Sequence, residues 1–150
     1  SAERARALPN PPVYVLGVGG PATHHDIIYT DHDMTTTPVV DSAPTALNMA
    51  QVNIRDIQLA QFYDCYTILE MSCLEDAGIV PKGDIGPFYE STDTTYKGSF
   101  PVNTDGGQIG AGQSGGTGGG FRHIVEATRQ IMGRGDERQV EEADLCLVNG

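Results

Sequence analysis

The sequence predicts a layered α/β domain, with helices packed on a sheet. Short β-branched and aromatic runs, which are typical of buried strands, alternate along the chain with segments of helical spacing. The chain has 150 residues, of which 39% are hydrophobic and 19% are charged, so it holds enough apolar material for one domain with one core. The order of the expected elements is β-α-β-α-loop-α-β.

The first half of the chain is expected to contain two strands and one helix. Pro11 and Pro12 forbid a helix, so the chain before them is expected to be irregular. Thr37 followed by Pro38 is typical of a helix N-cap and first helical position. The expected segments are irregular chain at 1–12, a buried strand at 13–18, a polar loop at 22–36, a helix from 38 to 49 and a strand at 56–62.

The second half is expected to contain two further helices and a last strand. Asp64 stands where a cap for the next helix is expected, and Gly78 is a natural stop for that helix. Apolar residues from Phe121 to Met132 recur at helical spacing, and His123 is expected to be a partly buried residue of that helix. The expected segments are a helix at 64–77, excursion loops at 81–102, a helix at 119–132 and a strand at 143–148.

The charge of the chain disfavours several classes of function. Its formal net charge is −11, which repels nucleic-acid phosphates and anionic lipid, and no apolar run has the length needed to span a bilayer. Three cysteines, Cys65, Cys73 and Cys146, form no C-x-x-C pair, and we interpret them as reduced core thiols of a cytoplasmic protein. Paired histidines and aspartates between residues 24 and 33 show no ligand spacing, so no metal site is expected there.

Glycine is concentrated in one place, with nine of the 19 glycines between residues 106 and 120. This segment lacks the preceding strand and following acidic residue of a dinucleotide-binding turn, and it lacks the lysine of a P-loop. Glycines permit close backbone approach and positive φ angles, and a helix that starts after them offers free N–H groups. The segment therefore suits a carbonyl oxygen or an oxyanion, the alternative being a flexible surface loop.

Two separated segments give the chain a family resemblance. The stretch from Asn103 to Gly119 resembles the thiolase segment Asn-x-x-Gly-Gly-x-x-x-x-Gly-His-Pro-x-Gly-x-x-Gly, and the run Asp56 to Thr67 resembles the strand-to-helix turn that carries Asn-Glu-Ala-Phe in thiolases and His-Asp-Cys-Phe in the sterol-carrier type. The resemblance covers nearly the whole chain from Val13 onward, at the expected order and spacing. It is similar to the C-terminal half of a thiolase-superfamily subunit, nearest the bacterial lipid-transfer-protein type, which includes steroid side-chain aldolases. The implied fold is a layered α-β-α half with a mixed sheet over residues 13–150.

The resemblance implies a site that is altered from the family pattern. Tyr63 and Gln113 stand where thiolases have the Asn and His of the oxyanion hole, and both are assigned catalytic roles. Tyr66, one turn on, is the alternative tyrosine. No cofactor is implied beyond the CoA of the substrate, and the implied substrate-binding positions are Asn103, Asp105, Gly106, Gly107, Gly112 and Gly116.

The resemblance implies an acyl-CoA-processing enzyme that cleaves a C–C bond next to a CoA thioester, with a retro-aldol reaction preferred. Two alternatives are an acyltransferase that uses a cysteine of the absent N-terminal half, and a subunit that binds acyl-CoA without catalysis. The implied partners are that N-terminal half, a second copy in a homodimer, and a small protein with an OB-fold and a zinc ribbon. We expect the chain to be a fragment or a separate subunit.

Overall fold

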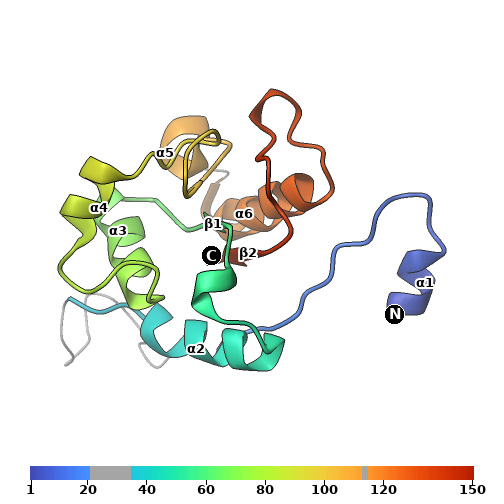
Figure 1. The fold of residues 1–150 in the computed structure, drawn as a ribbon, viewed down its shortest axis with the longest axis horizontal. Coiled ribbons are helices and arrows are strands. Elements are labelled where there is room, and N and C mark those ends of the chain that lie inside the picture. The colour runs from blue at the N-terminus through green and yellow to red at the C-terminus, as the bar shows by residue number, and fades with distance from the viewer. Residues whose placement is uncertain (21–34, 113–114) are drawn as a thin grey trace.

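The computed structural model describes residues 1–20, 35–112 and 115–150 (Figure 1). Its helices and strands follow the expected alternation along most of the chain. In chain order the elements are α1 (Ala2–Arg6), α2 (Val39–Ala50), the 3-10 turn η1 (Ile54–Asp56), β1 (Leu59–Gln61), α3 (Thr67–Asp76), α4 (Ile85–Ser91), α5 (Gly107–Ala111), α6 (Gly115–Ile131), the 3-10 turn η2 (Asp136–Arg138) and β2 (Cys146–Val148).

A small parallel sheet lies at the centre of the molecule (Figure 1). β1 pairs with β2 in the register Leu59 to Cys146, and on its other side Ala60 forms a parallel bridge with Val102. α2 and α3 lie on one side of β1, and α6 packs on both strands from the other side. The layered α/β arrangement is confirmed, whereas the expected mixed sheet is replaced, within the described residues, by parallel pairing.

Side chains of β1 alternate between the two layers, as the period of a strand requires. Ala60 and Phe62 are fully buried against α2 and α3, while the amide of Gln61 points to the α6 side and bonds Thr104. Leu59 and Ala127 are buried apolar residues elsewhere, whereas the apolar core cluster lies on the face of the sheet towards α2 and α3. Its buried members are Val39, Ala43, Ala60, Phe62, Cys73, Leu74, Ala77, Val80 and Val102.

The N-terminal segment differs from the prediction in two ways. Residues 2–6 form a short helix capped by the Ser1 hydroxyl where irregular chain was expected. Residues 13–18 form no strand: Val15 is 80% exposed and Val18 is 61% exposed. A strand needs a neighbouring strand to bond its backbone N–H and C=O groups. In the described residues this segment runs beside the helix α2 instead, so closely that a Cβ on Gly17 would lie 2.0 Å from Ala46 O. Figure 1 shows α1 and the chain after it extending away from the other elements.

Two further short helices, α4 and α5, were not expected from the sequence. α4 forms inside the predicted excursion loops. Pro87 is compatible with this helix because it lies in the first turn, where a backbone N–H has no partner within the helix. Phe88 of α4 then stacks edge-on against Phe100, with ring centroids 6.3 Å apart. α5 forms within the glycine stretch. The helices predicted at 38–49, 64–77 and 119–132 are confirmed as α2, α3 and α6, with ends shifted by a few residues.

α6 buries a polar face and exposes an apolar one. His123, Glu126 and Gln130 are at most 1% exposed, whereas Phe121 is 66% exposed and Ile124 is 47% exposed. A surface helix normally turns its apolar stripe to the core.

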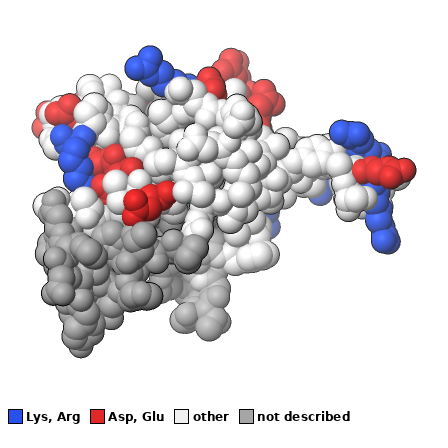
Figure 2. Space-filling model, turned by 90° about the horizontal axis from the view of Figure 1, so that it is seen from below, with Lys and Arg blue, Asp and Glu red and all other residues white. Residues whose placement is uncertain are grey.

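Figure 2, which views the molecule from the side on which α2 lies, shows a broad surface without charged side chains. This surface lies between the arm that carries α1 and the charged groups at the opposite end of the view. No helix in the described part of the chain is long and apolar enough to cross a membrane.

Candidate functional site

The candidate site lies where the turn after β1 meets the glycine stretch. Asn103 joins these two segments: its Oδ1 accepts from Phe62 N–H at 2.8 Å and its Nδ2 donates to Phe62 O at 2.9 Å. Its backbone has a φ of 48°, a left-handed value that asparagine tolerates better than most residues. The side chain of Asn103 thus continues the sheet pairing and fixes the backbone directly before Tyr63.

Asp64 caps α5, and the prediction that it caps the helix after it in sequence is wrong. α3 begins at Thr67 with Tyr66 as its N-cap residue. The Asp64 carboxylate instead accepts from the backbone N–H of Gln108 at 2.7 Å and of Ile109 at 3.4 Å. The first N–H groups of a buried helix need an acceptor, and the glycine-rich chain before α5 supplies no capping side chain at Gly106.

Glycine is required at Gly107 by both space and backbone angle. Its φ is 58°, and an added Cβ would lie 2.2 Å from Asp64 Oδ2. Gly106 and Gly112, which bracket α5, also have left-handed φ angles, of 96° and 97°. The backbone of Gly116 lies in the first turn of α6. Gln113, the second predicted catalytic residue, lies outside the described residues.

Asp105 holds the glycine loop, residues 103–112 of the glycine stretch, in place. One carboxylate oxygen accepts from Gly107 N–H at 3.0 Å and the other accepts from Arg122 Nε at 2.8 Å. Arg122 also donates to the carbonyl oxygen of Gly112 at 2.9 Å. Both oxygens of Asp105 therefore have protein partners, and this ion pair ties the end of α5 to α6.

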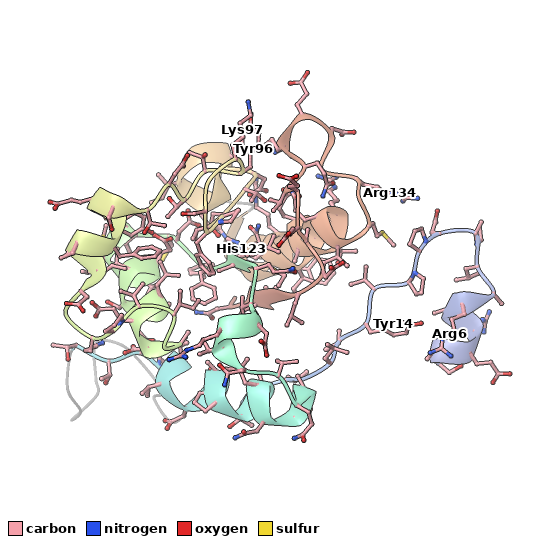
Figure 3. The ribbon with its side chains drawn as sticks, viewed as in Figure 1. Arg6, Tyr14, Tyr96, Lys97, His123 and Arg134 are labelled. Atoms are coloured by element: carbon pink, nitrogen blue, oxygen red, sulfur yellow. The ribbon has the colours of Figure 1, made fainter. Side chains whose placement is uncertain are left out.

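Tyr63 is half-buried at the start of the turn, and its ring meets His123 of α6. The two ring centroids are 6.2 Å apart at an interplanar angle of 64°. Figure 3 labels His123 in the interior of the molecule, and it is fully buried where partial burial was expected. Burial lowers the pKa of His123, although the nearby carboxylates of Asp64 and Asp105 act in the opposite direction.

A buried polar chain links the loop to α6 beneath the site. Gln61 Nε2 donates to Thr104 Oγ1 at 2.9 Å, and that hydroxyl donates to Glu126 Oε1 at 2.8 Å. Gln130 Nε2 donates to the same Glu126 oxygen at 3.0 Å. Sequence reasoning missed these residues, although polar side chains at positions 123, 126 and 130 follow a helical spacing that could have indicated a second face of α6.

Cys73 is a buried core residue as predicted, whereas Cys65 and Cys146 are both partly exposed. Burial raises the pKa of Cys73 to about 11 and that of Cys146 to about 12, so both remain thiols at neutral pH. Cys65 is partly exposed in the turn after Tyr63, and the alternative tyrosine, Tyr66, is 72% exposed. Neither Cys73 nor Cys146 has the thiolate character of a nucleophile.

No group of three or more histidine, cysteine or acidic residues is arranged to hold a metal ion within residues 1–20, 35–112 and 115–150. The histidines and aspartates between residues 24 and 33 lie outside these ranges. The described residues of the site thus combine a tyrosine, a buried imidazole and a glycine-lined backbone. That set suits a neutral oxygen or an oxyanion.

Comparison with known proteins identifies the family. A family model described as "Thiolase C-terminal domain-like" matches residues 20–150. The chain belongs to this family, and the resemblance predicted from the turn after β1 and the glycine stretch is confirmed.

The names of individual relatives describe two kinds of enzyme activity, acyl transfer and aldol cleavage. The chain is 32% identical to an acetyl-CoA acetyltransferase of Methanothermobacter thermautotrophicus over 99% of this chain and 38% of that protein. It is also 32% identical to a steroid side-chain-cleaving aldolase of Thermomonospora curvata over 100% of this chain and 38% of that protein. The chain therefore spans well under half the length of these relatives.

One solved structure shows the same fold. The chain superposes on an Ltp2-ChsH2(DUF35) aldolase with a TM-score of 0.80 and 28% sequence identity, over 94% of this chain and 37% of the other. The α/β architecture described above is therefore that of the thiolase C-terminal half.

Proposed function

We propose that this chain is the C-terminal half of an enzyme that cleaves a C–C bond next to a CoA thioester by a retro-aldol reaction. The observation that carries the proposal is Tyr63, which replaces the asparagine of the thiolase turn and lies against the glycine loop. Similarity to a steroid side-chain-cleaving aldolase over the whole chain supports it.

The proposed reaction uses the described residues as follows. Tyr63, as its phenolate, accepts the proton of the β-hydroxyl group as the bond between the α and β carbons breaks, which leaves a carbonyl product and the enolate of the acyl-CoA. Return of that proton to the enolate carbon restores the phenolate. Backbone N–H groups of the glycine loop, with Gln113, stabilise the enolate oxygen until its carbon takes up a proton. One such donor contributes roughly 3 kcal/mol of barrier lowering.

The other predicted site residues have separate parts in this proposal. Asn103 and Asp105 shape the pocket, since their side chains already bond Phe62, Gly107 and Arg122. The glycines at 106, 107, 112 and 116 let the backbone come close to the substrate. CoA enters only as part of the substrate.

Replacing Tyr63 by phenylalanine in the complete enzyme tests the proposal. We expect kcat for a β-hydroxyacyl-CoA to fall by about 100-fold or more, because general acid–base groups contribute about that much. Tyr66→Phe is the matched control, since Tyr66 is exposed, and its kcat is expected to stay near the wild-type value. Full turnover by the Tyr63→Phe enzyme would contradict the proposed role.

A second candidate is an acyltransferase that uses a cysteine of the N-terminal half. Similarity to an acetyl-CoA acetyltransferase favours it. This reaction would form an acyl-enzyme, which mass spectrometry of the complete protein detects as an adduct on that cysteine. Binding of acyl-CoA with neither adduct nor cleavage would favour a non-catalytic subunit.

The apolar face of α6 supports an N-terminal thiolase half as the partner. Phe121, Ile124 and Val125 are exposed on neighbouring turns, and the chain covers only 38% of its relatives. Covering such a face by the missing half would remove it from water. We further propose a homodimer, and a small OB-fold zinc-ribbon protein as an accessory partner. The similar solved structure, an Ltp2-ChsH2(DUF35) aldolase whose name joins two components, supports an accessory partner.

A further inference from the structure

We propose that Gln108 and His123 line a buried polar pocket behind Tyr63 that binds one water molecule, and that they are positioning residues for the tyrosine. The inference rests on the proposed function of Tyr63, and it adds two residues that the family pattern does not mark. Gln108 lies in α5 and His123 lies in α6, so the pocket is assembled from two helices and the turn after β1.

The first observation is a set of unpaired buried atoms. Gln108 is 5% exposed and His123 is 0% exposed. Both side-chain amide atoms of Gln108 and both ring nitrogens of His123 have no hydrogen-bond partner among the described residues. An unpaired buried polar group costs about 1–3 kcal/mol, so these four atoms favour a bound partner that both donates and accepts. A buried water makes about three hydrogen bonds to such groups.

The second observation is that the side chains of Gln108 and Tyr63 converge at Gly119. A Cβ on Gly119 would lie 2.7 Å from Gln108 Nε2 and 2.8 Å from Tyr63 Cε2. His123 lies four residues further along α6, on the same face as Gly119, and its ring meets that of Tyr63 edge-on. The glycine therefore allows the amide and the phenol ring to approach α6 side by side.

The third observation is that Asp64 connects the two proposed residues. Its Oδ1 accepts from Gln108 N–H at 2.7 Å and lies 3.7 Å from His123 Nε2. That separation is longer than a hydrogen bond, so Asp64 orients α5 while the imidazole stays available to another partner. Asp105 and Arg122 are the other charged groups that act on His123. Any pH dependence of the pocket involves all four.

Crystallography of the complete enzyme at high resolution tests the pocket without reference to activity. We expect one ordered water within hydrogen-bonding distance of a Gln108 side-chain atom and a His123 ring nitrogen. Direct hydrogen bonds from these atoms to protein groups, with no water between them, would overturn the proposal. This outcome is independent of whether the Tyr63→Phe enzyme is inactive.

Kinetics of three variants test the positioning role. In His123→Leu and Gln108→Leu enzymes we expect kcat to fall on the order of tenfold to hundredfold, with KM changed little, because Tyr63 loses its fixed position. His123→Gln keeps a hydrogen-bonding side chain and should recover most of kcat. We also expect kcat to decline at acidic pH as His123 is protonated, and His123→Gln should abolish that decline. Wild-type kcat in both leucine variants, or an unchanged acidic limb in His123→Gln, would overturn the role.

Discussion

The two faces of α6 differ in the opposite sense to most surface helices. The face towards the sheet carries His123, Glu126 and Gln130, all buried and polar, whereas the outer face carries Phe121 and Ile124 in contact with solvent. By contrast, α3 packs Cys73 and Leu74 into the apolar core and exposes Ile68, and its buried polar residue, Asp76, lies at its last position. The difference shows that α6 forms a polar wall beneath the candidate site on one side and exposes apolar side chains on the other.

The buried face of α6 should give the largest effect on stability. Glu126→Ala removes the acceptor of the buried Thr104 hydroxyl, and it removes one of the acceptors of the Gln130 amide, which keeps its bonds to Thr104 Oγ1 and Arg138 O. We expect the free energy of unfolding to fall by about 3 kcal/mol, measured by urea denaturation. Glu137→Ala is the control, because Glu137 is exposed, and a loss below about 0.5 kcal/mol is expected. Equal losses in the two variants would contradict the comparison.

The close contact between Gly107 of the glycine loop and Asp64 can be tested by adding a single methyl group. Gly107→Ala places a Cβ against the Asp64 carboxylate at a positive φ, and should cost about 2 kcal/mol while it displaces α5. Gly110→Ala is the matched control in the same helix, since a Cβ there meets no atom within 4 Å. It should be neutral or slightly stabilising. Equal denaturant midpoints for the two variants would show that the contact with Asp64 does not constrain the loop.

The buried imidazole predicts a pH dependence with a definite sign. Because burial lowers the folded-state pKa of His123 below its usual 6.5, the unfolded chain binds more protons in the interval between the two values. The contribution of His123 to stability is thus complete above pH 6.5 and is progressively lost as pH falls through that interval. Thermal unfolding from pH 7.5 to 5 should show a shallower acid decline for His123→Gln. Superimposable profiles would mean that His123 titrates alike in both states.

The exposed face of α6 should have the smallest effect on stability and a large one on association. Phe121→Asp should change the free energy of unfolding of this chain by less than about 0.5 kcal/mol, because the side chain is mostly in solvent. The same change should prevent binding of the N-terminal half, measured by size-exclusion chromatography of the two halves. Normal association of the variant would show that the partner docks elsewhere.

The elements that the sequence predicted correctly are those defined by local signals. Gly78 with a φ of 79° ends α3, and the apolar run before Tyr63 forms β1. The run at 13–18 has the same strand-like composition but forms no strand, because pairing depends on a neighbour and composition does not supply one. Local patterns thus predict elements well when their partners also lie within this chain.

The site was predicted only in outline, for a related reason. The approach of the turn at Tyr63 to the glycine loop followed from the family resemblance. The partnership of Asp64 with Gln108, 44 residues away, was not predictable, because capping signals are read from adjacent residues. The burial of His123 was missed because the apolar spacing of α6 indicated the other face as the core.

A crystal structure of the complete enzyme with a non-cleavable β-hydroxyacyl-CoA analogue tests the central claim most directly. The account predicts that the thioester oxygen lies at the glycine loop and the β-hydroxyl beside Tyr63, with the apolar face of α6 covered by the N-terminal half. A pocket of about 520 Å³ lies away from Tyr63, between the segment 96–101 and residues 139–142. An analogue bound there, with Tyr63 out of contact, would contradict the account.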